Sequence, residues 1–354
     1  MIVSLPVSSP HPGTGPYDPA SPQAQWDAEL DALGGSLLQS WRWGAVKASC
    51  GWEVERIRVE VGGKIGLAQL LIRRYGPFGF AYLPRGPVVE NDETVVTALF
   101  DAIDRTCAQH HVITLVVEPD APVFPGGECD DLGFMPGPQP VQPERTVRVP
   151  ILDDDDILAQ MRRDTRANLR RAERHGVVTE RAAPSATSID RFYRLLSETS
   201  TRNAFGVHTR EYYADVLHRF GDDALLAFAR VDAGDAIGLI ALRQGTEAVY
   251  LYGCSSTSRR IRGASVLLQY EAMRWARERG CTCYDLWGIP AANPPAKDLA
   301  CGQVQPARGN RLDGLYQFKT GFGGGIVSYP PPIERRYHPF LAWITRHSSR
   351  YRTT

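Results

Sequence analysis

The fold is decided by residues 231–289, which read VDAGDAIGLIALRQ (231–244), AVYLYGCSS (248–256), ASVLLQYEAMRWARERG (264–280) and CTCYDLWGI (281–289). The first segment is typical of a β-hairpin and the second of a strand, because both are rich in apolar and β-branched residues. The third has apolar residues at helical spacing, and the fourth is a short apolar run typical of a buried strand. This β-β-α-β order predicts an α/β domain with a mixed sheet.

The first half of the chain repeats this order. The corresponding segments are WEVERIRVEVGGKIGLAQLLIRR (52–74), FAYLPRGPVV (80–89), NDETVVTALFDAIDRTCAQHH (91–111) and ITLVVEPD (113–120). They predict a hairpin, a strand, a helix and a buried strand. The spacing supports a repeat, because Leu115 follows Tyr82 by 33 residues and Asp285 also follows Tyr252 by 33 residues. The sequence therefore predicts a duplicated α/β domain.

The acidic run Asp153–Asp156 marks the predicted seam between the two domains, and it is also a signal for a helix N-terminus. A chain of 354 residues is long enough for two domains that each bury a core. We expect a flexible N-terminal lead at residues 1–22, because six of these residues are prolines. The first domain is expected at 23–150 and the second at 151–330, and the C-terminal segment 331–354 is expected to complete the first domain.

Composition excludes several classes of protein. The 40 basic and 40 acidic residues balance, which argues against nucleic-acid binding through bulk positive charge. Seven scattered cysteines without a C-x-x-C pair fit reduced thiols and a cytoplasmic protein. We find neither a signal peptide nor an apolar run long enough to span a membrane. P-loop, GxGxxG, GxSxG and HExxH patterns are absent from the sequence, so we expect no cofactor and no metal.

Only four of the basic residues are lysines, and one of them stands in an unusual context. In LYQFKTGFGGG (315–325), Lys319 lies between aromatic residues and directly before a glycine-rich bend. An ammonium group held by aromatic rings can stabilise a developing oxyanion. The alternative is a surface lysine whose alkyl chain lies over aromatic rings.

The helix expected after the acidic run is rich in arginine. Four of its arginines are spaced by three, four and four residues and share one face: Arg163, Arg166, Arg170 and Arg174. This face could bind the phosphates of RNA or of a nucleotide, or it could be a solvated face paired with acidic neighbours. Further along, the turn Arg260–Gly263 between a strand and a helix could hold phosphate oxygens of CoA or RNA, or could be a plain turn.

Taken together, these segments resemble the FemABX family, aminoacyl-tRNA-dependent peptidyltransferases that build the interpeptide bridges of peptidoglycan. The resemblance runs from about residue 26 to 345 and rests on eight short motifs in the same order. The motifs are Leu38-Gln39-Ser40-Trp41-x-Trp43-Gly44-x-x-Lys47, Tyr82-x-Pro84-Arg85-Gly86-Pro87, Arg166-x-Asn168-x-Arg170-x-Ala172, Glu198-Thr199-x-x-Arg202, Glu211-Tyr212-Tyr213, Tyr252-Gly253-x-Ser255-Ser256, Tyr284-Asp285-x-Trp287-Gly288-Ile289-Pro290 and Gly314-Leu315-Tyr316-x-Phe318-Lys319-x-Gly321-Phe322-Gly323-Gly324.

The resemblance implies two tandem acetyltransferase-like (GNAT-type) α/β domains with mixed sheets. It also implies transfer of an amino acid from aminoacyl-tRNA to the side-chain amine on the third residue of a peptidoglycan stem peptide, carried by lipid II or UDP-MurNAc-pentapeptide. The donor ester is already activated, so such an enzyme mainly orients two reactants and stabilises a tetrahedral oxyanion. We expect a cytoplasmic monomer whose basic tail contacts the inner leaflet of the membrane or packs on the first domain.

The resemblance also assigns site residues. Lys319 corresponds to the essential lysine of the family, with Phe318 before it. The expected substrate-binding residues are Trp41, Lys47, Tyr82, Arg85, Arg202, His208, Tyr212, Tyr252 and Tyr316. The expected tRNA-binding residues are Arg163, Arg166, Arg170 and Arg260.

One departure from the family keeps further functions open. His208 stands where relatives carry a phosphate-binding arginine, four residues before Tyr212. A tRNA-dependent transferase acting on a natural-product amine would need no diphosphate contact there. A CoA-dependent N-acyltransferase that uses the Arg260–Gly263 turn is also compatible with the sequence, as is a non-catalytic module that binds tRNA or lipid.

Overall fold

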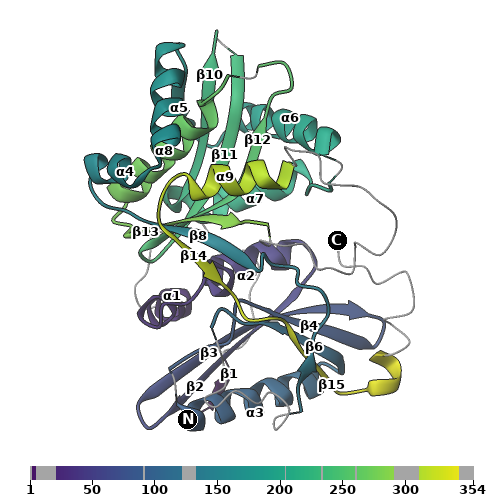
Figure 1. Cartoon of the computed structure of the whole chain (residues 1–354). Helices are drawn as coiled ribbons and strands as arrows, with labels where there is room; N and C mark the ends of the chain where they lie inside the picture. The colour runs from purple at the N-terminus through teal and green to yellow at the C-terminus, as the bar shows by residue number, and fades with distance from the viewer. Residues whose placement is uncertain are drawn as a thin grey trace, which may run out of the picture. The chain divides into compact units, whose positions relative to one another are not determined.

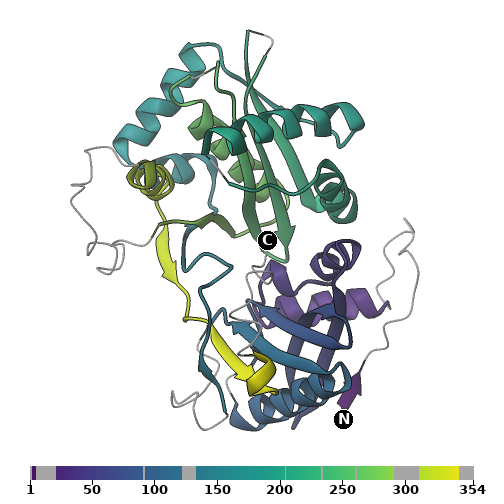
Figure 2. The same ribbon diagram turned by 90° about the vertical axis from the view of Figure 1, so that its right-hand side faces the viewer.

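The computed structural model forms two compact units, which are Met1–Gln142 with Tyr329–Thr354 (unit 1) and Pro143–Ser328 (unit 2). Each unit contains one mixed β-sheet with helices packed on it (Figure 1; Figure 2). The residues that the structure describes are 2–4, 21–90, 92–121, 133–203, 205–232, 234–259, 261–290 and 311–342, with only the backbone of 2–4 and 311–313.

The sheet of unit 1 has the strand order β1-β2-β3-β4-β6-β15-β7, and β5 pairs with β3. The strands are β1 (Ile2–Ser4), β2 (Glu53–Val61), β3 (Lys64–Tyr75), β4 (Phe78–Pro84), β5 (Val88–Val89), β6 (Val112–Glu118), β7 (Met135–Pro136) and β15 (Ile333–Arg336). The helices are α1 (Pro22–Ala32), α2 (Trp41–Ser49) and α3 (Glu93–Gln109), with a 3₁₀ turn at Leu37–Gln39.

The two ends of the chain both contribute strands to this sheet. β1 pairs with β2, so the expectation of a flexible lead is wrong for residues 2–4, and residues 5–20 lie outside the described residues. At the other end, β15 pairs with β6 and β7, so the first sheet includes strands from both ends of the sequence. Short-range sequence patterns do not report the pairing of β1, whereas a contribution of the C-terminal segment to the first domain is expected from the sequence.

Helix α3 illustrates how the sequence determines an element. The carboxylate of Asp92 caps its N-terminus by accepting hydrogen bonds from the backbone N–H groups of Thr94 (3.0 Å) and Val95 (3.3 Å). Apolar side chains at helical spacing, including Leu99 and Ile103, are fully buried on the sheet. The helix therefore begins and packs as the pattern at 91–111 predicts.

The sheet of unit 2 has the strand order β14-β8-β13-β12-β11-β10-β9. The strands are β8 (Arg145–Pro150), β9 (Val178–Arg181), β10 (Ala224–Val231), β11 (Gly234–Gln244), β12 (Glu247–Ser255), β13 (Cys283–Gly288) and β14 (Gly325–Ser328). The helices are α4 (Asp154–Gln160), α5 (Arg163–Arg174), α6 (Ala186–Asn203), α7 (Arg210–Phe220), α8 (Ala264–Glu278) and α9 (Arg311–Thr320), with a 3₁₀ turn at Gly221–Asp223. In the described part of the chain, no helix is long and apolar enough to cross a membrane.

The seam lies earlier than the sequence indicates. β8 pairs with β13 and β14, so residues 145–150 belong to the second sheet although the sequence places them in the first domain. The acidic run follows this strand and begins α4, where Asp153 accepts a hydrogen bond from the Asp156 N–H group (2.9 Å). A helix signal and a domain seam are thus separate features at this point.

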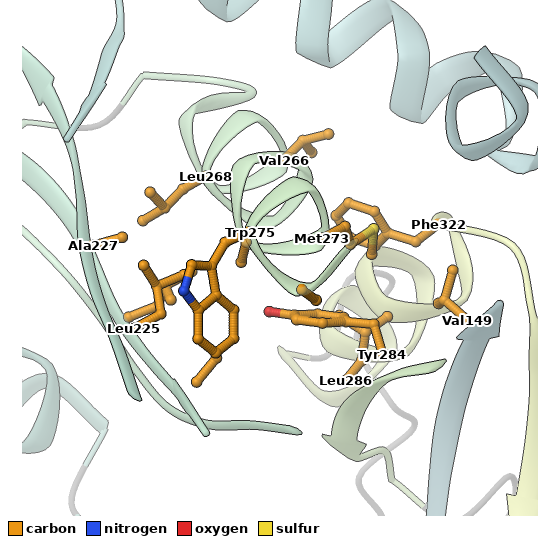
Figure 3. Packing of buried hydrophobic residues seen from close by; sticks show 14 of the residues in the cluster. Val149, Leu225, Ala227, Val266, Leu268, Met273, Trp275, Tyr284, Leu286 and Phe322 are labelled. Atoms are coloured by element: carbon orange, nitrogen blue, oxygen red, sulfur yellow. The ribbon is translucent and has the colours of Figure 1, made fainter. Parts of the chain in front are cut away.

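The main core of unit 2 lies between the sheet and α8 (Figure 3). Trp275 of α8 is directed toward Leu225 of β10, and Tyr284 of β13 lies beside them. Phe322, just after α9, is fully buried in the same cluster. Burial of each large side chain stabilises the fold by about 2–3 kcal/mol, so this core fixes the strands on which the candidate site stands.

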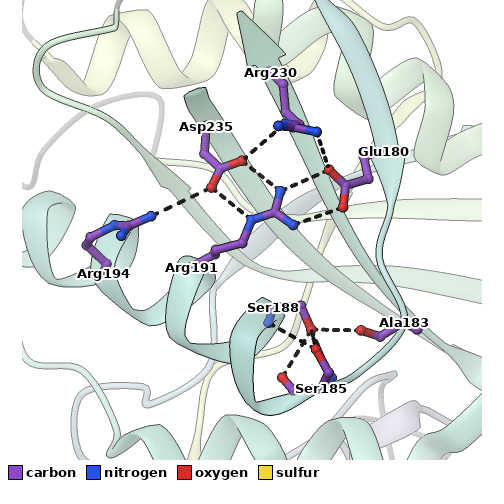
Figure 4. A network of polar contacts seen from close by, with 8 residues as sticks. All are labelled: Glu180, Ala183, Ser185, Ser188, Arg191, Arg194, Arg230 and Asp235. Carbon is purple, nitrogen blue, oxygen red and sulfur yellow. Dashed lines mark hydrogen bonds and ion pairs between the residues drawn. The ribbon is translucent and has the colours of Figure 1, made fainter. Parts of the chain in front are cut away.

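The other face of the sheet carries an ion-pair network that joins α6 to three strands (Figure 4). The Arg191 guanidinium of α6 contacts Glu180 of β9 (Nη1 to Oε1, 2.9 Å) and Asp235 of β11 (Nη2 to Oδ1, 2.7 Å). Arg230 of β10 contacts Glu180 at 3.2 Å. The side chain of Asp235 is only 8% exposed, so Arg191 neutralises a nearly buried charge.

Replacing Arg191 with methionine should lower the free energy of unfolding by about 2 kcal/mol, between the values typical of exposed and buried ion pairs. Urea denaturation measures this change. Arg194→Met is the matched control, because this arginine is mostly exposed and lies 3.8 Å from Asp235. We expect the control to lower the free energy of unfolding by less than about 0.5 kcal/mol, and equal decreases in the two variants would contradict the assignment.

Candidate functional site

The amino group of Lys319 is buried in unit 2. The residue is 6% exposed and lies in the last turn of α9. Its Nζ donates a hydrogen bond to the carbonyl oxygen of Gly288 at the end of β13 (2.8 Å) and lies 5.5 Å from the ring centroid of Tyr250 on β12. Burial lowers the pKa of Lys319 to about 8, although the carboxylate of Asp285 raises it. The group therefore changes charge at mildly alkaline pH.

The glycine-rich bend after Lys319 is closely packed. A Cβ atom on Gly323 would lie 2.5 Å from the carbonyl oxygen of Gln160, and one on Gly324 would lie 2.2 Å from that of Arg148. Both glycines also have positive φ angles, 87° and 75°, which residues with a side chain rarely adopt. The bend thus holds the end of α9 against α4 and β8, and it fixes the position of Lys319.

Strands β12 and β13 diverge where this lysine lies. Their parallel pairing ends at Val249 with Asp285, although β12 continues to Ser255 and β13 to Gly288. In unit 1 the equivalent strands, β4 and β6, pair in parallel along nearly their whole length. The Lys319 amino group reaches a residue on each of the diverging strands of unit 2. The divergence therefore brings a backbone carbonyl, an aromatic ring and an ammonium group together.

A bulge in β12 turns two tyrosines to opposite faces of the sheet. Ala241 of β11 pairs with Tyr250 and Ile240 pairs with Tyr252, so Leu251 is the extra residue. Tyr250 consequently packs with the core on the α8 side, where Lys319 lies. Tyr252 lies against α7 on the other face.

Three of the predicted acceptor-binding residues lie together on that other face. The hydroxyl groups of Tyr212 and Tyr252 are hydrogen-bonded to one another (2.9 Å). The imidazole of His208 stacks on the Tyr212 ring, with centroids 3.9 Å apart and planes 25° apart. The structure therefore makes His208, Tyr212 and Tyr252 one cluster, in which an aromatic ring replaces the arginine expected from the resemblance.

Arg202 organises the loop that leaves β12. Its guanidinium donates to the carbonyl oxygen and hydroxyl of Ser255 (3.2 and 2.7 Å) and to the hydroxyl of Thr257 (3.0 Å). Glu198 accepts a hydrogen bond from the Thr257 N–H group (3.0 Å). Arg202, Glu198 and Thr257 also line an open cavity of about 730 Å³, together with Arg194, Ser197 and Thr201. Arg202 thus borders a cavity, and its role in binding stays a prediction.

The two other predicted residues of α9 pack on the core of unit 2. Phe318 is half-buried, and its ring meets that of Phe322 edge to face at 5.2 Å. Tyr316 is also half-buried and packs on the core of unit 2. The substrate contacts expected of Phe318 and Tyr316 stay predictions.

Unit 1 contains a second set of predicted residues. The Nζ atom of Lys47 lies 4.6 Å from the ring centroid of Trp43, and burial lowers the pKa of this lysine. The Arg56 guanidinium stacks on the Trp41 ring at 3.7 Å, and the backbone N–H group of Trp41 donates to the Asp27 carboxylate (2.9 Å). Burial raises the pKa of Asp27 to about 6. Trp41 and Lys47 thus lie in aromatic and charged surroundings at the start and end of α2.

Tyr82 and Arg85 lie at the end of β4 in the same unit. The Tyr82 hydroxyl accepts a hydrogen bond from the Gln142 side chain (3.0 Å), and the buried Arg85 guanidinium stacks on the Tyr329 ring at 3.4 Å. Glu118 accepts hydrogen bonds from the backbone N–H groups of Val141 and Gln142 (2.6 and 2.8 Å). These contacts hold the loop that leads out of unit 1, which sequence patterns do not reveal.

The arginine face of α5 divides into two kinds of residue. The Arg166 Nη1 atom donates to the carbonyl oxygens of Leu158 (3.2 Å), Ala159 (3.0 Å) and Met161, which caps the C-terminus of α4. Arg163 and Arg170 are exposed. We therefore assign Arg166 to the α4–α5 turn rather than to a phosphate, while Arg260 lies outside the described residues.

Sequence reasoning missed the roles of two residues that surround Lys319. Asp285 of β13 is buried and Tyr250 of β12 is half-buried, and sequence patterns single out neither as functional. The motif that contains Asp285 is visible in the sequence, but its meaning depends on the fold. Among the described residues, no group of His, Cys, Asp or Glu side chains could hold a metal ion.

Comparisons with known proteins agree with this architecture. A model of the FemAB family matches residues 24–123, and a model of a GNAT acetyltransferase domain matches residues 159–295. The lipid II:glycine glycyltransferase of Staphylococcus aureus (strain MRSA252) is 26% identical over 75% of this chain and 82% of its own length.

Solved structures show the same fold. The crystal structure of FemX has a TM-score of 0.75 at 22% identity, covering 90% of this chain and 98% of FemX. A tandem GNAT protein from the clavulanic acid biosynthesis pathway has a TM-score of 0.51 at 14% identity, covering 95% of this chain and 98% of its own. The α/β class with GNAT-like domains, expected from the sequence, is therefore confirmed. With a FemAB model over its first half, a GNAT model over its second half, a glycyltransferase relative and the FemX fold, this chain is similar to the aminoacyltransferases of the FemABX family.

Proposed function

We propose that this enzyme transfers an amino acid from aminoacyl-tRNA to the side-chain amine on the third residue of a peptidoglycan stem peptide, and so starts an interpeptide bridge. Lipid II is the proposed acceptor, because the name of the staphylococcal relative, lipid II:glycine glycyltransferase, contains that substrate. UDP-MurNAc-pentapeptide is the soluble alternative. The observation that carries the proposal is the buried amino group of Lys319 between the diverging ends of β12 and β13.

The chemistry requires no nucleophile from the protein. The acceptor amine attacks the carbonyl carbon of the aminoacyl ester and forms a tetrahedral intermediate with a negatively charged oxygen. The Lys319 ammonium stabilises this oxygen from a site shielded from water, where a charge acts more strongly. The ester C–O bond then breaks, the ribose oxygen of the tRNA takes the proton that the amine loses, and an amide remains.

We assign the two substrates to separate groups of residues. Arg163 and Arg170 present exposed cations on α5 for the tRNA phosphates. The His208–Tyr212–Tyr252 cluster and the Trp41–Lys47 segment are assigned to the acceptor. We place the enzyme as a monomer at the cytoplasmic face of the membrane, with Phe340, which is 72% exposed, at the start of the basic tail.

The proposal is tested by incubating the protein with tRNA charged with glycine, alanine or serine and with either lipid II or UDP-MurNAc-pentapeptide. Mass spectrometry should show the stem peptide extended by one residue. Extension of an unrelated amine alone would favour the natural-product alternative. Saturable binding of acetyl-CoA, without any transfer from tRNA, would favour the N-acyltransferase instead.

The rate of transfer should fall as the pH rises through about 8. Oxyanion stabilisation needs the ammonium form of Lys319, whose pKa burial lowers to about 8, so the active fraction decreases above that pH. The measurement is kcat under saturating substrates between pH 6 and 9.5. A rate that keeps rising through pH 9 would show that Lys319 acts as a neutral base.

A further inference from the structure

Asp285 is a buried carboxyl group that the proposed reaction does not use. It is 2% exposed, near the end of β13 in unit 2. Its Oδ1 atom accepts hydrogen bonds from the Thr146 hydroxyl on β8 and from the backbone N–H group of Trp287 (2.6 Å). Arg148 of β8 lies 3.8 Å from Oδ2. The two hydrogen bonds fix the position of this carboxyl group, and with the nearby arginine they lower its pKa, although burial has the larger effect and raises it.

The hydrogen bond to Trp287 holds an unusual backbone conformation. Trp287 has a φ angle of 61°, in the left-handed region that a bulky residue rarely adopts. The pairing of β13 with β8 is also interrupted between Asp285 and Gly288. Because of this turn, the next carbonyl group, that of Gly288, accepts the hydrogen bond from Lys319 Nζ (2.8 Å). A continuous path of contacts thus joins Asp285 to Lys319.

We infer that Asp285 is a positioning residue for Lys319. It holds the turn at Trp287, which directs the Gly288 carbonyl group toward the Lys319 amino group. It also supplies the negative charge that acts on the Lys319 amino group. This inference rests on the proposed role of Lys319 in transfer. Asp285 itself touches neither reactant and acts through the lysine. Burial raises the pKa of Asp285, and Lys319 is among the cations that lower it, so the two groups are electrostatically coupled.

The other titratable and charged groups around this pair come from three strands. Tyr250 and Glu247 lie on β12, Cys283 and Tyr284 lie on β13, and Arg148 lies on β8. Burial raises the pKa of Tyr284, so it stays neutral. Burial raises the pKa of Cys283 to about 12 and that of Tyr250 further, so both stay neutral at the pH of the reaction. Arg148 pairs with Glu247 at 3.0 Å. Asp285 is therefore the anion expected to act on Lys319.

The test measures Lys319 directly, which the four lysines of this chain make practical. Protein labelled with ¹³C at the lysine ε-carbon gives four side-chain signals, and the one missing in Lys319→Met belongs to Lys319. Asp285→Asn keeps an oxygen that accepts from Thr146 and Trp287 but removes the charge. We expect the Lys319 pKa to fall by about one unit, and the alkaline decrease in transfer to move to lower pH by the same amount.

Glu247→Gln is the matched control, because it removes a nearby carboxylate that pairs with Arg148. In this variant the pKa of Lys319 should stay at the wild-type value. Asp285→Ala also removes the acceptor for Trp287, so its transfer rate should be low even at pH 6.5, where Lys319 is protonated. An unchanged Lys319 pKa in folded Asp285→Asn overturns the inference, whether or not transfer occurs. The NMR titration thus separates this inference from the proposed function.

If Asp285→Asn does not fold, the same coupling can be measured from the titration of the Asp285 carboxyl group. With ¹³C-labelled aspartate carboxyl groups, one signal should titrate at higher pH in Lys319→Met than in the wild type, because the coupling acts equally on both groups. Identical aspartate titrations in the two proteins would contradict the inference.

Discussion

Replacing Lys319 with methionine is expected to lower kcat for aminoacyl transfer by about 10²- to 10³-fold, the decrease typical of removing one oxyanion stabiliser. Methionine is similar to lysine in length but carries no charge, so it can fill the same buried space beside Tyr250. Because a buried charge is costly to the fold, the melting temperature should be unchanged or higher. Single-turnover kinetics and thermal denaturation measure the two effects separately.

Lys64→Met is the control for this experiment. Lys64 carries the same chemical change, but its side chain is 45% exposed and pairs with Asp92 on the surface of unit 1. Transfer by this variant should stay within about two-fold of the wild type, because an exposed ion pair contributes little. A decrease of less than about ten-fold in Lys319→Met, with the fold intact, would remove this lysine from the reaction.

Sequence patterns predicted those helices and strands that are determined by residues close to one another in the chain. Helix α3 follows from a capping aspartate and apolar residues at helical spacing, and the hairpin of β2 and β3 follows from Gly62 and Gly63 between β-rich runs. The duplicated order was visible for the same reason, since each copy has its own patterns. Lys319 could be selected because lysine is rare in this chain and because aromatic residues flank it.

Features that depend on tertiary contacts could not be predicted in this way. The spacing of the arginines placed Arg166 on the same face as Arg163, but spacing does not show that Arg166 reaches back to the carbonyl groups of α4. The φ angle of Trp287 likewise has no sequence signal, because tryptophan rarely adopts it. Such residues are recognised only when the partner that holds them, here Asp285, is seen beside them.

The two units share one strand order but differ in how far their parallel strands stay paired. Both have a hairpin, a third antiparallel strand, a helix and a parallel strand. In unit 1 the parallel pair β4 and β6 stays joined, and its backbone groups are satisfied within the sheet. In unit 2 the pair separates early, so carbonyl groups such as that of Gly288 are available to a side chain. This difference supports our proposal that the reaction takes place in unit 2.

Binding of the donor should depend on two exposed arginines of α5. Reversing the charge of both Arg163 and Arg170 to glutamate should raise KM for aminoacyl-tRNA by about 100-fold at low salt, with kcat nearly unchanged. Both side chains are exposed, and replacing them leaves no buried group unpaired. The slope of log KM against log salt should fall by roughly one for each phosphate that the variant no longer neutralises.

Two further variants make this result specific to the face of α5. Arg105→Glu changes the charge by the same amount as the single variant Arg163→Glu, but at an exposed position on α3 of unit 1, and it should leave KM within about two-fold. Arg166→Ala should instead lower the melting temperature, because it removes the cap of α4. If Arg105→Glu weakened tRNA binding as much as Arg163→Glu, the effect would be one of net charge. Weaker tRNA binding in the α5 variants alone would mean that a neutral protein binds RNA through a local concentration of arginine, because exposed charges more than about 8 Å from a phosphate are largely screened at physiological salt.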